Sequence, residues 1–204
     1  MDEIFRLLII TARPDAVSAL VWQFFFGKEF INMKKYIKGI LLFLILFGID
    51  QWTKNAATIY LKGQETKKVL GDFFVLRYLK NYGAAFGILQ NKQIFLILLT
   101  AVILVMILYV YIKTPDTPHY RLIRIFSIMF AAGAMGNMYD RFAHRYVIDF
   151  LYAKVIDFPI FNVADCYFVV SAVVLSMLIG FYYQEEDMAV YKFGGKKEKE
   201  SSSL

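Results

Sequence analysis

Carboxylates at the ends of long apolar segments are the residues of this 204-residue chain best suited to chemistry. Asp50 lies at the end of the first such segment, Asp140 at the end of the third, and Asp165 at the beginning of the fourth. Charged groups at membrane depth are costly and usually mark a functional interior. Carboxylates placed there can act as general acids and bases or relay protons, and both kinds of function remain open at this point.

The segments that carry these acids are long enough to cross a bilayer. A spanning helix needs about 20 mostly apolar residues, and the qualifying segments are 36–52, 94–112, 122–139 and 163–183. Buried helices of a soluble domain are the alternative. That alternative would leave too little polar surface, because 59% of the residues are hydrophobic and only 20% are charged, against about 25% charged in soluble proteins. We therefore expect an all-α membrane protein with four transmembrane helices.

Composition excludes several other classes of function. The net charge is +6, but the cations flank apolar runs instead of forming a stripe, so we expect no nucleic-acid partner. A single cysteine, Cys166, excludes an internal disulfide framework and a Cys-rich zinc site. With only two histidines, His119 and His144, a His-based metal centre is not expected either. We predict no metal and no cofactor.

The basic residues also predict an orientation. Lysine and arginine are enriched in cytoplasmic loops, and they precede the first segment, lie between the second and third, and occur in the C-terminal tail. Both termini are then cytoplasmic, although the loop 55–92 is also basic; that loop is long, and long loops translocate with less regard to charge. Under this topology the polar ends of the segments converge near the outer leaflet. They are Asp50, Asn81, Asn137, Asp140, Arg141, Asp149 and Asp165.

The residues outside the spans predict smaller features. Residues 66–80 are rich in β-branched and aromatic types around a Gly-Asp break, which indicates a hairpin, and 82–89 could form an interfacial helix. Residues 1–32 fit poorly, and Met33 followed by two lysines resembles a natural start. We interpret 1–32 as an extension or misassigned start, with an amphipathic anchor as the alternative, 33–185 as the membrane domain and 186–204 as a polar tail.

Five short blocks carry the polar residues in a fixed order between the spans. They are Asp50-Gln51-Trp52-Thr53-Lys54, Asn81-Tyr82-Gly83-Ala84-Ala85-Phe86, residues 133–141 (GAMGNMYDR), Val147-Ile148-Asp149-Phe150 and Phe161-Asn162-Val163-Ala164-Asp165. Together they resemble the lipoprotein signal peptidases, the type II signal peptidases of bacteria, over about residues 33–185. One departure is Ala132 before Gly133, where the family often has two glycines.

The resemblance implies a catalytic pair, Asp149 and Asp165. It also implies a supporting set formed by Asp50, Lys54, Asn81, Gly83, Ala85, Gly133, Asn137, Asp140, Arg141, Asn162 and Ala164. Residues 155–158 repeat the Val-Ile-Asp-Phe block, so Asp157 is a competitor. In the family the first acid follows the Asp of the Asn-x-x-Asp-Arg block by nine residues, which selects Asp149 after Asp140.

The implied activity is aspartyl endopeptidase cleavage of diacylglyceryl-cysteine prolipoproteins in the bacterial cytoplasmic membrane. The active site would face the outer leaflet, the protein would be a monomer in contact with phospholipids, and the hairpin and 82–89 would form a platform and lid. Two acids in a poorly hydrated site share one proton, so that one activates water and the other protonates the leaving amine. A proton-coupled small transporter component and a non-catalytic scaffold are the alternatives.

Several of these residues also have structural interpretations. Asp165 could cap the last span, where a carboxylate is favoured by the helix dipole. Asp50 and Lys54 are four residues apart, the favourable order for a helix ion pair. Asp140 and Arg141 could form an ion pair that holds the loop bearing Asp149.

Overall fold

The computed structural model describes residues 27–71, 73–84 and 88–191. The chain divides into two compact units, residues 1–40 and 41–204, and all of the site described below belongs to the second. The long helices are α3 (Gly27–Leu61), α4 (Gln93–Lys113), α5 (Arg121–His144) and α6 (Val163–Met177), the last continued by a π-helical turn, Leu178–Tyr182. The strands are β1 (Lys67–Leu70), β2 (Phe74–Asn81) and β3 (Val147–Ala153), followed by short helical turns at Lys154–Ile156, Glu185–Met188 (α7) and Ala189–Tyr191.

Among the residues that the structure describes, four helices are long and apolar enough to cross a membrane, which confirms the predicted architecture. They are Met33–Leu61, Gln93–Lys113, Arg121–His144 and Val163–Tyr182. The first continues nine residues beyond the expected end at Trp52. The reason is that Lys54 finds a partner within the helix in Asp50, while Ala57 and Leu61 are buried against Phe150 of the sheet.

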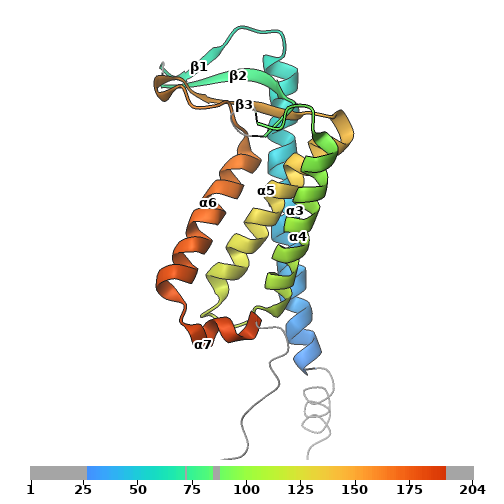
Figure 1. Cartoon of the computed structure of the whole chain (residues 1–204), viewed down its shortest axis with the longest axis vertical. Helices are drawn as coiled ribbons and strands as arrows, with labels where there is room; N and C mark the ends of the chain where they lie inside the picture. Colours follow the sequence, from blue (N-terminus) through green and yellow to red (C-terminus); the bar gives the residue numbers. More distant parts are fainter. Residues whose placement is uncertain (1–26, 72, 85–87, 192–204) are drawn as a thin grey trace, which may run out of the picture. The chain divides into compact units, whose positions relative to one another are not determined.

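The ends of these helices meet beside the sheet. The C-terminal ends of α3 and α5 and the N-terminal ends of α4 and α6 lie at the sheet end of the bundle, whereas the α4–α5 connection and α7 lie at the other (Figure 1). Because neighbouring helices run in opposite directions, the polar ends of three helices come together at one level. At the far end, the rings of Tyr120 and Tyr183 stack on each other and pack with Ile123 and Leu178 in a small core.

The C-terminal segment packs against that far end. Thr114 and Tyr191 are joined through their hydroxyl groups at 2.8 Å, and the Tyr120 hydroxyl donates to the carbonyl oxygen of Asp187 at 3.1 Å. The first residues of the expected tail, up to Tyr191, therefore form short helical turns on the domain. The remainder of the tail and residues 1–26 lie outside the described residues.

The sheet is antiparallel with strand order β1-β2-β3. Its first two strands are the predicted hairpin, and Gly71 has the positive φ of 56° that the turn requires. The third strand was not predicted, because its sequence has no period-two alternation: the first four residues of β3 are all buried. Strand pairing sets Leu79 of β2 opposite Asp149 of β3.

The interfacial helix predicted at 82–89 is wrong for the residues of that segment that the structure describes. Residues 82–84 and 88–89 lie in bends and turns. Backbone hydrogen bonds join Ala84 N–H to the Ile88 oxygen at 2.7 Å and Asn91 N–H to the Tyr82 oxygen at 2.9 Å. Leu89 and Asn91 have positive φ angles of 58° and 62°, so a folded-back loop has replaced the helix that small apolar residues suggested.

Candidate active site

Asp149 reaches the site from the beginning of β3, and its side chain is only 1% exposed. One carboxylate oxygen accepts a hydrogen bond from Asn81 Nδ2 at 2.9 Å, and the other from Asn162 Nδ2 at 2.6 Å. Burial, followed by repulsion from the nearby Asp165, raises the pKa of Asp149 to about 7. A carboxyl group in this setting can hold or release its proton near neutral pH.

Asp165 reaches the site from the first turn of α6. Its Oδ2 accepts the backbone N–H of Asn162 at 3.0 Å, while Asn162 Oδ1 accepts the backbone N–H of Asp165 at 3.0 Å. This capping box fixes the helix start, so the structural interpretation of Asp165 as a cap is confirmed. The cap uses only one of its carboxylate oxygens, because Oδ1 accepts instead from Asn137 Nδ2 at 2.7 Å.

Two asparagines connect the acids. Asn162 Nδ2 donates both to Asp149 Oδ1 at 2.6 Å and to Asn137 Oδ1 at 3.1 Å. Asn137 in turn donates to Asp165. A continuous chain of hydrogen bonds therefore joins Asp149 to Asp165 through the two amides.

A buried ionic cluster lies behind these amides. Lys54 Nζ lies 2.9 Å from Asp50 Oδ2 and 3.1 Å from Asp140 Oδ2, and all three side chains are at most 1% exposed. Gln51 joins the two carboxylates by donating to Asp50 at 3.0 Å and to Asp140 at 3.3 Å. The predicted Asp50–Lys54 ion pair is confirmed. We call these four residues the charge hub.

The charge hub is tied to the elements that carry the acids. Asp50 Oδ1 accepts the backbone N–H of Ala164, in the first turn of α6, at 2.9 Å. Asp140 Oδ2 accepts the backbone N–H of Ile148, the residue before Asp149, at 3.2 Å. The hub thus fixes the approach of β3 and of α6 to the site.

Arg141 has a different partner from the one expected. Asp140 pairs with Lys54 instead of Arg141, whose guanidinium donates to the carbonyl oxygens of Gly83 at 3.0 Å and Asn137 at 3.2 Å. The side chain at position 141 points away from its neighbour at position 140, because consecutive helix residues do not share a face. The expected contact with the strand that bears Asp149 does exist, but it is made by Asp140, which accepts the backbone N–H of Ile148, and not by an Asp140–Arg141 ion pair.

Small residues allow α3, α5 and α6 to approach closely. A methyl group at Gly136 would collide with the Asp50 carboxylate, and one at Gly133 would meet the carbonyl oxygen of Ala164. Ala164 is fully buried between these helices. The supporting glycine and alanine positions therefore make room for the hub and for the start of α6.

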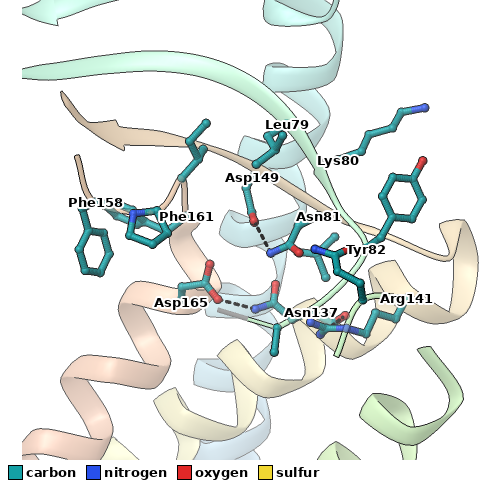
Figure 2. Close-up of a pocket in the computed structure, with 15 residues that line it drawn as sticks. Leu79, Lys80, Asn81, Tyr82, Asn137, Arg141, Asp149, Phe158, Phe161 and Asp165 are labelled. Atoms are coloured by element: carbon teal, nitrogen blue, oxygen red, sulfur yellow. Dashed lines mark hydrogen bonds between the residues drawn. The ribbon is translucent and has the colours of Figure 1, made fainter. Parts of the chain in front are cut away.

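The acids open into a pocket of about 420 Å³ between the sheet and the helix ends. Figure 2 shows Asp149 and Asp165 on facing sides of this space, held by Asn81 and Asn137 respectively. One wall is apolar and the opposite rim is polar. The apolar wall consists of Phe158, Pro159, Ile160 and Phe161, and the polar rim of Lys80, Tyr82, Gln90 and Arg141, with Leu79 next to Lys80 on β2.

The structure brings almost all of the residues named from the sequence into this network; only Ala85 lies outside the described residues. Asp157 does not join them: it is exposed, has a φ of 46°, and accepts a hydrogen bond from the Tyr152 hydroxyl at 2.5 Å. Sequence reasoning overlooked two glutamines, Gln51 in the hub and Gln93, whose Nε2 donates to the Tyr82 oxygen at 2.5 Å. A polar residue at the end of an apolar run was the available signal for both.

The chain is similar to known proteins over most of its length. Residues 42–181 match the family described as signal peptidase (SPase) II. The lipoprotein signal peptidase of Clostridium novyi is 38% identical over 141 residues, which are 67% of this chain and 94% of that protein. That of Caldanaerobacter subterraneus subsp. tengcongensis is 40% identical over 144 residues, 70% of this chain and 96% of that protein.

Two solved structures share the overall fold. A bacterial membrane enzyme solved at 2.3 Å resolution has a TM-score of 0.62 and 30% identity, covering 81% of this chain and 94% of its own. A second, at 1.9 Å, has a TM-score of 0.63 and 29% identity, covering 72% and 94%.

Proposed function

Because this chain belongs to the signal peptidase II family, the lipoprotein signal peptidases, we propose that Asp149 and Asp165 are the catalytic pair of its peptidase activity. The observation that carries the proposal is that both carboxylates line one pocket and are joined by the amides of Asn137 and Asn162. The remaining acids at this level, Asp50 and Asp140, are occupied by Lys54 and by backbone N–H groups.

The reaction needs one proton on the pair. Two close carboxyl groups in a site with little water do not both ionise readily, so they hold a single proton between them. The ionised group takes a proton from water as that water attacks the peptide carbonyl carbon. The protonated group polarises the carbonyl oxygen and then gives its proton to the leaving amine. The two acids titrate as a pair, and each step is assigned to the pair.

The substrate we propose is a prolipoprotein whose cysteine carries a diacylglyceryl group, cut on the N-terminal side of that cysteine. The apolar wall from Phe158 to Phe161 suits apolar parts of the substrate, and the polar rim suits its peptide backbone. Arg141 fixes the carbonyl of Gly83 at this rim. We assign no cofactor to the reaction, because two carboxyl groups and water supply every proton transfer it needs.

The proposed placement in the membrane follows from the basic residues. With both termini in the cytoplasm, the sheet end of the bundle faces the outer leaflet, where the lipid-modified cysteine of a translocated prolipoprotein would lie. The protein would act as a monomer in the bacterial cytoplasmic membrane, among phospholipids. Reactivity of single cysteines placed in the β1–β2 turn and in the α4–α5 connection, measured in intact cells, tests this orientation.

The catalytic assignment is tested with three isosteric variants, Asp149→Asn, Asp165→Asn and Asp157→Asn. The last is a matched control, because Asp157 lies in a repeat of the same four-residue block but outside the pocket. We expect purified, reconstituted Asp149→Asn and Asp165→Asn to insert normally and to lose cleavage of a diacylglyceryl prolipoprotein, while Asp157→Asn keeps it. Retained cleavage in Asp149→Asn with loss in Asp157→Asn would overturn the assignment.

A further inference from the structure

The Lys54 side chain is buried away from any substrate, and its ammonium group donates to three acceptors within the protein. Its side chain is 1% exposed. Its three partners are Asp50 Oδ2 at 2.9 Å, Asp140 Oδ2 at 3.1 Å and Asn137 Oδ1 at 2.9 Å. An ammonium group has three protons to donate, so each of them has one acceptor. The contact with Asn137 is the one that leads out of the charge hub toward the acids.

The amide of Asn137 can be held in either of two orientations that exchange its oxygen and nitrogen. Only one suits Asp165, because an ionised carboxylate accepts hydrogen bonds and cannot donate them. Lys54 can only donate, so the Asn137 oxygen must face Lys54 and the nitrogen must then face Asp165.

The same oxygen fixes the second asparagine. Asn137 Oδ1 also accepts from Asn162 Nδ2 at 3.1 Å. This orients the nitrogen of Asn162, not its oxygen, toward Asp149, to which it donates at 2.6 Å. Lys54 therefore fixes the direction of donation to Asp165 and, together with the capping box in which Asn162 Oδ1 accepts the backbone N–H of Asp165 at 3.0 Å, the direction of donation to Asp149, although it contacts neither acid.

We infer that Lys54 is a positioning residue which acts through Asn137 to hold both acids as hydrogen-bond acceptors. The inference rests on the proposed catalytic pair. Its consequence is that both amides are preorganised to stabilise negative charge on the pair, which favours the form that deprotonates water. The charged groups around the acids include Lys54 and Asp50 of α3, Asp140 and Arg141 of α5, and Lys80 of β2 at the pocket rim.

A double-mutant cycle tests this inference, with Lys54→Met and Asn137→Leu separately and together. We expect each single variant to lower kcat about 100-fold, within the usual range for acid–base catalysis, with a smaller change in KM. If Lys54 acts through Asn137, the kcat of the combined variant should be within a few-fold of the kcat of the less active single variant. A combined loss near the product of the two, or no detectable turnover, would overturn the inference.

Two further measurements separate positioning from loss of structure. Removing Lys54 leaves the two buried carboxylates of Asp50 and Asp140 without a cation. The cycle is therefore repeated in an Asp140→Asn background. There, Lys54→Met gives the charge hub the formal charge of −1 that it has in the wild type (+1 for Lys54, −2 for Asp50 and Asp140). Continued low kcat in this folded, charge-matched protein supports positioning, and recovery of kcat overturns it. The pH midpoints of kcat/KM should also move upward in Lys54→Met, whereas unchanged midpoints would contradict a role in the site.

Matched controls complete the experiment. Lys62→Met makes the same exchange at an exposed lysine just beyond the end of α3, and we expect wild-type kcat. Asp149→Asn is measured beside it: retained cleavage there would refute the catalytic pair itself, whereas lost cleavage with an additive cycle would refute only the role of Lys54.

Discussion

The carboxylate of Asp50, on α3, accepts the backbone N–H of Ala164, on α6, at 2.9 Å. A side chain from the first spanning helix thus satisfies one of the free N–H groups at the start of the last. Asp165, the next residue, receives its position from this contact and from its own capping box. A change in the charge hub should therefore also move the side chains that line the pocket.

Asp50→Ala should destabilise the protein strongly. The change leaves Lys54 with one fewer anionic partner and the Ala164 N–H without an acceptor. Breaking a buried ion pair costs about 3–5 kcal/mol, which corresponds to a fall of about 10 °C in Tm. Thermal unfolding in detergent measures the effect. The control is Asp116→Ala, which removes a more exposed pair with Arg124 at 2.9 Å and should cost about 0–1 kcal/mol; equal losses in the two variants would contradict the prediction.

Gly136→Ala should also be harmful, for a steric reason. The new methyl group would collide with the Asp50 carboxylate, so either α5 must move away from α3 or Asp50 must leave its partners. Overpacking of this kind costs about 1–3 kcal/mol, and we expect lower Tm and lower cleavage. Gly48→Ala on α3 is the control, because nothing lies within 4 Å of its added methyl group, and it should be neutral or slightly stabilising. A harmless Gly136→Ala would show that the helices are less tightly packed than described.

Cleavage should decline as pH rises through about 7. Burial and the proximity of Asp165 raise the pKa of Asp149 to about 7, and above that pH the pair loses its last proton, so that no acid remains for the leaving amine. A pH profile of kcat/KM between pH 5 and 9 measures this. The profile of Asp157→Asn should match that of the wild type, and a rate that stays constant up to pH 9 would speak against a shared proton.

The stability of the wild type should change with pH over the same range. The pKa of Asp149 lies above its usual value of 3.8 in the folded protein, so the folded state binds this proton more tightly than the unfolded state. The resulting stabilisation is complete below about pH 4 and is lost as pH rises through about 7. Asp149→Asn should lack this loss, so its Tm relative to that of the wild type should rise between pH 4 and pH 8. Parallel Tm curves for the two proteins would contradict the raised pKa.

Sequence alone identified the helices because spanning segments must be apolar over their whole length, and it identified the polar network because charges are rare at that depth. The nine-residue spacing from Asp140 that the family resemblance implies then favoured Asp149 over Asp157, although both follow the same Val-Ile dipeptide. The partner of Asp140 was not predictable. A pairing with Lys54 requires α5 to present Asp140 to α3, and a contact between two helices cannot be read from the sequence.

The third strand and the loop after β2 were missed for a related reason. All four residues from Val147 to Phe150 are buried, so no alternation marks them as a strand. Residues 82–89 are mostly small or apolar, as an interfacial helix would be. The Gly83 carbonyl instead accepts from Arg141 of α5, and the Tyr82 carbonyl accepts from Gln93 at the start of α4. Contacts with other elements of the fold decided both segments.

The i,i+4 spacing of Asp50 and Lys54 has a consequence for biogenesis. When α3 enters the lipid ahead of the other spans, its two opposite charges already neutralise one another on a single helix face. Asp140 is synthesised later, on α5, and adds a second carboxylate to Lys54. The backbone N–H of Ala164, at the start of α6, then donates to the second carboxylate oxygen of Asp50. The Asp50–Lys54 ion pair is therefore complete within one span before the later spans are synthesised.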